Sequence, residues 1–270
     1  MLPEQPAARV RIGDTVVTRH TAAEVITIVA DRLVGSSTAP LAVGSVNLDH
    51  LHHFRCGREP LPERPEWLWL ADGAPVAWRG ARFADGRWPR VTGADLLEPL
   101  LQEAAVLGAQ VGFLGGQPAT HERLAAVLET RYPHALPARY WAPERAEIES
   151  LDTSIELAAQ IRDAGVRMLV VGLGKPRQER WIAQHAGDTG ADVLLAFGAA
   201  ADFLAGVVDR APLAYRRYGL EWLYRLGQEP RRLARRYLVQ GPAALVQLRH
   251  AAREEFPVTP PSTAQPGGQP

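Results

Sequence analysis

The sequence has little cysteine and no uninterrupted long apolar run, and both absences narrow the class of protein. Its single cysteine, Cys56, excludes an internal disulfide and is typical of a protein of the reducing cytosol. The longest apolar stretch, residues 191–208, contains Asp192 and Asp202 and is a poor candidate for a membrane-spanning helix. The N-terminus lacks the apolar core of a signal peptide. We therefore expect a cytosolic protein without a spanning segment.

Net charge is also absent, because 30 basic residues balance 30 acidic ones. We accordingly expect no nucleic-acid partner. No Asp-x-Asp pair, the usual clamp for a metal-bound diphosphate, occurs in the sequence. His50, His52 and His53 are close together, but spacings of two and one residues cannot place all three on one helical face. We interpret them as solvated surface and predict no metal site.

What is present is an alternation of apolar runs and helical patterns. A hairpin is predicted at residues 9–17, with its turn at Gly13-Asp14. Between residues 40 and 200 the predicted strands are residues 39–46, 67–70, 111–114, 138–140, 168–171 and 193–197. The predicted helices follow Thr21, which begins a capping box with Glu24, then Asp95, Pro118 and a cap at Thr153. This order predicts an α/β fold, a parallel Rossmann-like sheet with helices on both faces.

Residues 168–212 hold the strongest local pattern. A buried strand ends at Gly172-Leu173-Gly174, polar residues 175–180 enter a helix, and a second strand ends at Gly198. In a βαβ unit such glycines let backbone N–H groups approach a phosphate near a helix start. The glycines alone are equally typical of a turn, but a plain turn would not need the dense polar insert.

Other chemistry-bearing residues also follow predicted strands. Ser45 and Asn47 end the strand of residues 39–46, and Asp72 follows residues 67–70, where open α/β sheets form their ligand crevice. A turn or helix-cap role is the alternative for Asp72. Gly115-Gly116 closes the strand of residues 111–114. Residues 79–89, flanked by Trp78 and including Trp88, predict an irregular loop that would serve as a lid.

The chain changes character after Pro212. Residues 210–253 contain ten arginines and two acids, Glu221 and Glu229. On a helical projection, four arginines at 231, 232, 235 and 236 oppose the apolar residues 233, 234, 237 and 238. Such a helix is either a solvated face or a binding site for anionic lipid or pyrophosphate. We divide the chain into an α/β core (residues 1–212), a C-terminal basic helical appendage (213–255) and a disordered tail (256–270).

These motifs occur together and in order: Ser45-x-Asn47, Ala71-Asp72-Gly73, Arg90-Val91-x-Gly93-x-Asp95, Phe113-Leu114-Gly115-Gly116, residues 172–181, Asp202-Phe203-x-x-Gly206, Arg210-Ala211-Pro212 and residues 219–226. Over roughly residues 10–240 the chain resembles the WecG/TagA/CpsF family of bacterial glycosyltransferases. The resemblance implies a peripheral enzyme on the inner face of the cytoplasmic membrane. It would transfer N-acetylmannosamine or its uronic acid from a UDP-sugar to a polyprenyl-diphosphate-linked sugar, with inversion and with neither metal nor other cofactor.

The resemblance also implies roles for individual residues. Asp72 matches the proposed base, Ser45 stands where the family usually has threonine, and Asn47 and Gln178 match polar active-site positions. The C-terminal arginines that match those credited with neutralising the leaving UDP are Arg225, Arg232 and Arg235, and arginine suits this task because its charged fork binds phosphate bidentately. The other motif positions taken as substrate-binding are Arg90, Gly115, Gly116, Gly172, Gly174, Glu179, Asp202 and Arg210.

Three alternatives stay open at this point. The first is a different donor within the same family, for example UDP-glucose. A nicotinamide oxidoreductase would use the same βαβ unit, but no Gly-x-Gly-x-x-Gly follows a predicted strand. A non-catalytic adaptor would use the arginine-rich end alone, which leaves Asp72, Asn47 and Gln178 unexplained. The sequence also leaves open whether the chain forms a homo-oligomer.

Overall fold

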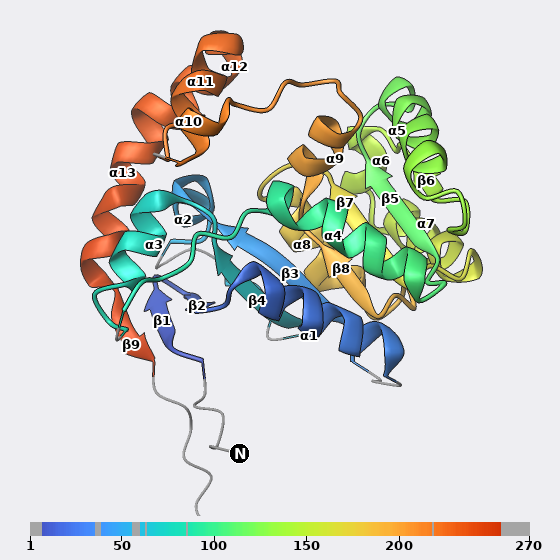
Figure 1. Cartoon of the computed structure of the whole chain (residues 1–270), viewed down its shortest axis with the longest axis horizontal. Helices are drawn as coiled ribbons and strands as arrows, with labels where there is room; N and C mark the ends of the chain where they lie inside the picture. Colours follow the sequence, from blue (N-terminus) through green and yellow to red (C-terminus); the bar gives the residue numbers. More distant parts are fainter. Residues whose placement is uncertain are drawn as a thin grey trace, which may run out of the picture.

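A twisted sheet runs through the middle of the molecule in the computed structural model (Figure 1). The structure describes residues 7–35, 39–55, 60–62, 64–84, 86–217 and 219–254. Within these residues the sheet has nine strands: β1 Arg9–Ile12, β2 Thr15–Thr18, β3 Leu41–Val46, β4 Glu66–Ala71, β5 Val111–Gly115, β6 Arg139–Trp141, β7 Met168–Gly172, β8 Val193–Leu195 and β9 Ala252–Glu254.

The strand order is β6-β5-β7-β8-β3-β4-β2-β1-β9. Every pair from β6 to β2 is parallel, and only β1 pairs antiparallel with both of its neighbours, β2 and β9. The predicted hairpin is confirmed, with its turn at Gly13, whose φ is 63°. The mostly parallel α/β sheet is therefore confirmed, but it has a mixed edge that the sequence pattern did not predict.

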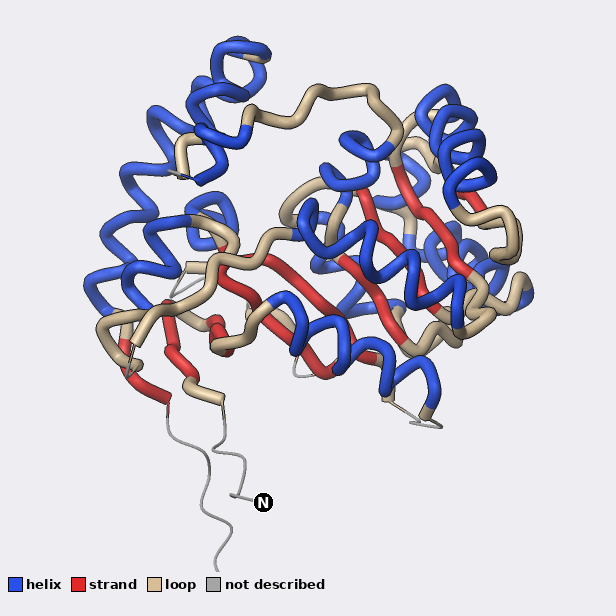
Figure 2. Tube along the Cα trace, viewed as in Figure 1, coloured by secondary structure: helices blue, strands red, loops and turns tan. Residues whose placement is uncertain are grey.

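Helices occupy most of the remaining described residues (Figure 2). Those that precede residue 205 are α1 Ala22–Val34, α2 Leu48–His53, α3 Ala74–Gly80, α4 Gly93–Val106, α5 Pro118–Arg131, α6 Arg145–Glu149, α7 Leu151–Asp163, α8 Arg177–His185 and α9 Gly198–Leu204. The later ones are α10 Leu213–Arg217, α11 Glu221–Gln228, α12 Pro230–Ala234, the π-helix η1 Arg235–Gln240, α13 Gly241–Leu245 and the 3₁₀-helix η2 Val246–His250.

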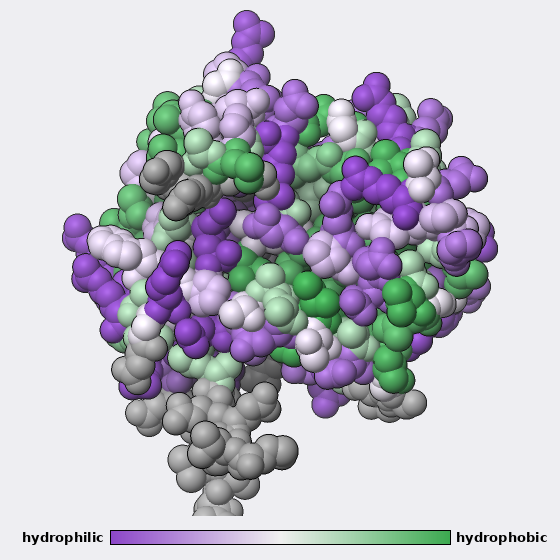
Figure 3. Space-filling model, viewed as in Figure 1, coloured by the Kyte–Doolittle hydropathy of each residue, from purple (hydrophilic) through white to green (hydrophobic). Residues whose placement is uncertain are grey.

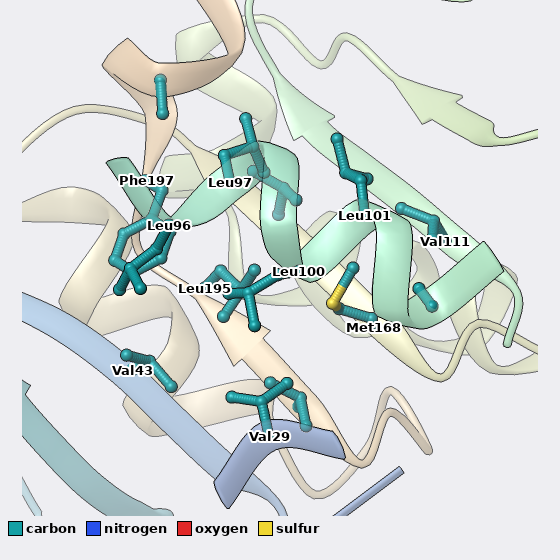
Figure 4. Close-up of a cluster of buried hydrophobic side chains, with 14 of the residues drawn as sticks. Val29, Val43, Leu96, Leu97, Leu100, Leu101, Val111, Met168, Leu195 and Phe197 are labelled. Carbon is teal, nitrogen blue, oxygen red and sulfur yellow. The ribbon is translucent and has the colours of Figure 1, made fainter. Parts of the chain in front are cut away.

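Helices pack on both faces of the sheet, as predicted. Side chains alternate along each strand, so neighbouring residues enter opposite layers. On β7, Met168 and Val170 belong to a core cluster with α1 and α4, which Figure 4 shows around Leu96 and Leu100. The intervening Leu169 packs in a second cluster with α7 and α8. Burial on both faces explains why these strands read as continuous apolar runs.

Several local predictions need correction. The capping box at Thr21 is confirmed, because both of its reciprocal hydrogen bonds are present. The next cap is wrong: Ser150, not Thr153, caps α7. Residues 79 and 80 are helical, as the end of α3, and Trp88 is only 6% exposed. The segment expected to be a lid is thus anchored by a buried ring against Gly80.

The C-terminal segment differs from one amphipathic α-helix. It changes to a π-helix at Arg235, so the 3.6-residue projection no longer holds there. Leu233 is 2% exposed, as an inward-facing residue should be, whereas Leu238 is 59% exposed. Residues 252–254 form β9 on the sheet instead of a helix. The tail of residues 256–270 lies outside the described residues.

No helix in the described part of the chain is long and apolar enough to cross a membrane.

Candidate active site

The carboxyl ends of β5 and β7 mark a topological switch in the sheet. From β5 the chain passes through α5 to β6 on one side, and from β7 it passes through α8 to β8 on the other. The two helices also leave on opposite faces, since Leu124 of α5 and Ile182 of α8 belong to different core clusters. Open α/β sheets bind their ligands in the crevice that such diverging connections leave.

Glycines line this crevice because the backbones are very close. Gly115 has φ +92°, and a Cβ atom placed there would lie 2.6 Å from the carbonyl oxygen of Gly172. Gly172 in turn lies against Gly198, the first residue of α9. A pocket opens at this point, and its polar lining residues are Thr120, His121 and Asp202. The predicted substrate-binding glycines Gly115, Gly116 and Gly172 and the predicted Asp202 are therefore brought together.

Gly116 and Gly174 complete the glycine turns at these strand ends. Both have positive φ, 87° and 75° respectively, a conformation that other residues rarely adopt. His121 approaches the same turn, with its Nε2 2.7 Å from the carbonyl oxygen of Gly115. The glycine turns that the sequence predicted are thus present at both strand ends.

Asn47 and Asp72 meet at the ends of β3 and β4. These strands are parallel and in register, so Val46 lies beside Ala71 and the next residues project from the same edge. The Asn47 side chain caps α2 by accepting from the N–H of His50, and its Nδ2 donates to Asp72 Oδ2 over 3.2 Å. The sequence predicted both residues separately, and the register explains their contact.

Gln178 and Glu179 are buried side chains in the first turn of α8. Gln178 is 4% exposed and donates from Nε2 both to Glu179 Oε1 and to the carbonyl oxygen of Ala196, each over 3.1 Å. Glu179 is fully buried, and its Oε1 lies 3.0 Å from the ammonium of Lys175. Lys175 also donates to the carbonyl oxygen of Ser45 over 2.6 Å. In this structure Glu179 contacts protein groups instead of an open binding surface.

Arg210 lies between the carboxylates of Asp95 and Glu221, and these three side chains form a second polar cluster. The Arg210 guanidinium lies 2.5 Å from Asp95 Oδ1 and 3.9 Å from Glu221 Oε1. Burial opposes ionisation of Asp95, but hydrogen bonds from Thr92 and Arg210 outweigh it and lower its pKa. Burial raises the pKa of Glu221, and the charge of Asp72 raises it further against the opposing effect of Arg210. Asp95 and Glu221 thus both lie near Arg210, but their pKa values shift in opposite directions.

The remaining predicted arginines are placed unequally. The loop at Arg90 runs beside β4, because Val91 N–H donates to the carbonyl oxygen of Ala71, and the charge of Arg90 acts on both Asp95 and Glu221. The Arg225 guanidinium lies 5.5 Å from the centre of the Phe203 ring on α9. Arg235 is exposed at the start of η1. The side chain of Arg232 lies outside the described residues.

The histidine interpretation is partly wrong. His50 is fully buried between the rings of Phe54 and Trp69, and its Nε2 lies 3.0 Å from Thr15 Oγ1. Within the described residues no group of three or more potential ligands is arranged to hold a metal ion. His53 instead lies 3.7 Å from Asp49 on its own helix.

Sequence reasoning did not select Lys175 and Glu221. Lys175 stood inside the polar insert after Gly174, and Glu221 was one of two acids in a segment of ten arginines. Lys175 could have been selected because it is the one lysine of the sequence, and Glu221 because it is an acid in a strongly basic segment. What the sequence could not show is that both approach the edge formed by Ser45 and Asp72.

A comparison with known families places these residues in context. A sequence model described as "Glycosyl transferase WecG/TagA/CpsF family" matches residues 10–256. The match spans every strand from β2 to β9, all of β1 but its first residue, and the whole of the arginine-rich segment.

Proposed function

The chain belongs to the WecG/TagA/CpsF family of glycosyltransferases, which act in cell-surface glycan synthesis, and from that premise we propose a specific reaction. The donor is a UDP-sugar, with N-acetylmannosamine or its uronic acid favoured over glucose. The acceptor is a sugar linked to polyprenyl diphosphate. The contact between Asn47 and Asp72, at the same carboxyl edge of the parallel sheet as the glycine-lined pocket, carries this proposal.

The proposed chemistry needs one base and a stabilised leaving group. The Asp72 carboxylate takes the proton of the acceptor hydroxyl as its oxygen attacks the anomeric carbon. The bond from that carbon to the UDP oxygen breaks, and configuration inverts. The hydrogen bond from Asn47 Nδ2 holds the Asp72 carboxylate in a fixed orientation at the end of β4.

Arginine is the proposed counter-charge for the departing UDP. Arg225 comes from α11 and reaches Phe203, next to the pocket residue Asp202, while Arg210 connects α4 with α11. An arginine fork binds phosphate oxygens bidentately and remains charged at any working pH. In this proposal no metal ion takes part.

We also propose a peripheral location on the inner face of the cytoplasmic membrane. The C-terminal segment combines arginines with exposed apolar side chains, among them Trp222 (41% exposed), Leu223 and Val239. Figure 3 shows apolar residues among polar ones along the outer edge of these helices. Near an anionic surface each basic residue contributes about 1 kcal/mol of attraction.

The decisive experiment supplies the purified full-length chain with a synthetic lipid-diphosphate N-acetylglucosamine and a panel of UDP-sugars. We expect UDP release and a lipid-linked disaccharide with only one or two donors. An Asp72→Asn chain serves as the matched inactive control. Transfer from none of the donors, or protection against unfolding by NADH in place of UDP, would contradict the proposal.

A further inference from the structure

Lys175 is the only lysine in the 270-residue sequence, alongside 29 arginines. Its side chain is only 9% exposed, although lysine is among the residues least often buried. A buried ammonium is costly unless it is paired and hydrogen-bonded. The one lysine of the chain therefore occupies a largely buried position, and we ask which contacts there fit an ammonium but not a guanidinium.

The contacts of Lys175 fit an ammonium. Its Nζ donates to the carbonyl oxygen of Ser45 over 2.6 Å and lies 3.0 Å from Glu179 Oε1. Glu179 is fully buried and is also bound by Gln178, whose second hydrogen bond goes to Ala196 after β8. An ammonium is a compact point donor on a narrow stem, whereas a guanidinium needs a wider space.

These contacts connect the middle of the sheet to the proposed base. The polar chain passes from Ala196 through Gln178, Glu179 and Lys175 to Ser45, two residues before Asn47. Asn47 then donates to Asp72. Ser45 is the second-last residue of β3, so holding its carbonyl oxygen holds the end of the strand that leads into the Asn47 cap.

We propose that Lys175 is a positioning residue for the transfer reaction: by binding the Ser45 carbonyl it holds the end of β3 so that Asn47 stays within hydrogen-bonding distance of Asp72. The inference rests on the proposed function and adds a residue to it. Lys175 acts through Ser45 and Asn47, and Glu179 supplies the charge that keeps the ammonium in place. Small displacements of a catalytic group have large effects, since about 1 Å costs on the order of 100-fold in rate.

The test compares three full-length variants. Lys175→Met removes the donor but leaves the buried charge of Glu179 unpaired, so this variant is expected to lose stability. Lys175→Met combined with Glu179→Gln removes both charges of the pair, and we expect this double variant to keep the fold. Arg180→Met is the matched control, because Arg180 is an exposed basic residue on α8, the helix that carries Glu179.

We expect the double variant to bind UDP as the wild type does, with its donor KM within about two-fold and its kcat lower by about 10- to 100-fold. Its Asn47 side-chain amide should shift in ¹H–¹⁵N spectra, whereas Arg180→Met should change neither kinetics nor that signal. A double variant with wild-type kcat and an unmoved Asn47 signal would overturn the inference.

One measurement needs neither turnover nor a variant. Lysine-selective ¹⁵N labelling gives a single side-chain signal, since the chain has one lysine. We expect ammonium protons that exchange slowly with water, and a rapidly exchanging signal at the free-lysine position would overturn the inference. The proposed function fails separately, if the wild-type chain transfers sugar from no UDP-sugar while these spectra behave as expected.

Discussion

Asp72 and Glu221 are two carboxyl groups with different surroundings. Asp72 follows β4 and accepts a hydrogen bond from Asn47, whereas burial and the nearby charge of Asp72 raise the pKa of Glu221. Pairs of acids whose environments differ are a common basis for separate roles in one site. Asp72 is the member that Asn47 orients at the strand end, and it is the proposed base.

Replacing Asp72 by Asn should therefore remove the base and leave the fold. We expect turnover to fall by about 10²–10⁴-fold, the range for loss of a general base, with UDP affinity retained. Initial rates and UDP titrations of the purified variant measure both effects. Asp31→Asn, an exposed carboxylate on α1, is the control. Near wild-type turnover in Asp72→Asn would reject this assignment.

The buried imidazole of His50 makes the free energy of unfolding depend on pH. Burial lowers its pKa well below the usual value of 6.5, and the positive charges of Lys175 and His53 lower it further. The unfolded chain therefore binds more protons than the folded one below about pH 6.5, so the free energy of unfolding decreases as pH falls. The burial-lowered pKa values of His20 and His185 act in the same direction.

We expect His50→Gln to flatten the loss of stability between pH 7 and pH 5, though it lowers stability at neutral pH. Chemical denaturation at several pH values measures the slope. His134→Gln, at an exposed turn, should retain the wild-type slope. An unchanged slope in His50→Gln would show that His50 does not titrate in this way.

At the scale of elements, the close approach of β5 and β7 determines the crevice. A methyl group on Gly115 would collide with the Gly172 backbone and would also force a φ of +92° on alanine. The Gly172 backbone cannot move aside as a flexible side chain would, because it is paired with Gly115 at the ends of the two strands. The strand ends would have to separate.

Gly115→Ala should consequently lower the free energy of unfolding by about 1–3 kcal/mol and weaken UDP binding. Denaturant titration and calorimetric UDP binding measure the two effects. Gly187→Ala is the matched control, since a Cβ atom there meets nothing within 4 Å, and it should change stability by less than about 1 kcal/mol. Equal behaviour of the two variants would contradict the packing argument.

At the scale of the whole molecule, the C-terminal segment belongs to the sheet as well as to the proposed site. β9 pairs with β1, and Ala244, Leu248 and Ala251 are buried in a core cluster with residues of β1 and β2. Cutting the chain before residue 213 would remove these contacts together with the arginines. Point variants therefore separate catalysis from folding better than truncation does.

Arg225→Ala should slow transfer to a short-chain, water-soluble acceptor by about 100-fold, the scale for loss of one stabilising donor. Its binding to anionic vesicles should weaken by only about five-fold, because about 1 kcal/mol is lost per basic residue. Arg231→Ala, exposed on α12, should show the same vesicle effect with normal turnover. Vesicle sedimentation and initial rates distinguish them, and equal turnover in both variants would remove Arg225 from the site.

The proposed counter-charge is arginine throughout, so transfer should be unaffected by EDTA. The arrangement of Arg210, Arg225 and the surrounding acids motivates this expectation. Rates are compared before and after chelation and after addition of Mn²⁺ or Mg²⁺. Loss of activity with EDTA that either ion restores would contradict a metal-independent mechanism.

The periodic parts of the fold were predictable from the sequence. Continuous apolar runs such as residues 168–171 indicated strands buried on both faces, and the Thr21–Glu24 pair correctly marked the start of α1. Such features depend on residues that are close in sequence. Strand β9 was missed because its partner, β1, lies at the other end of the chain. The π-helix at Arg235 and the cap at Ser150 were also missed, although the cap is a local hydrogen bond from the Thr153 N–H.

By itself the sequence determined the chemical inventory of the site: the carboxylate of Asp72, the amide of Asn47, the glycine turns and the surplus of arginine at the C-terminal end. Only the tertiary structure decided which of these groups meet. Parallel register places Asn47 against Asp72 across 25 residues, and Lys175 reaches Ser45 across 130. Hydrogen bonds and ion pairs act over a few ångströms in space and do not depend on sequence separation, so the folded sheet alone brings such partners together.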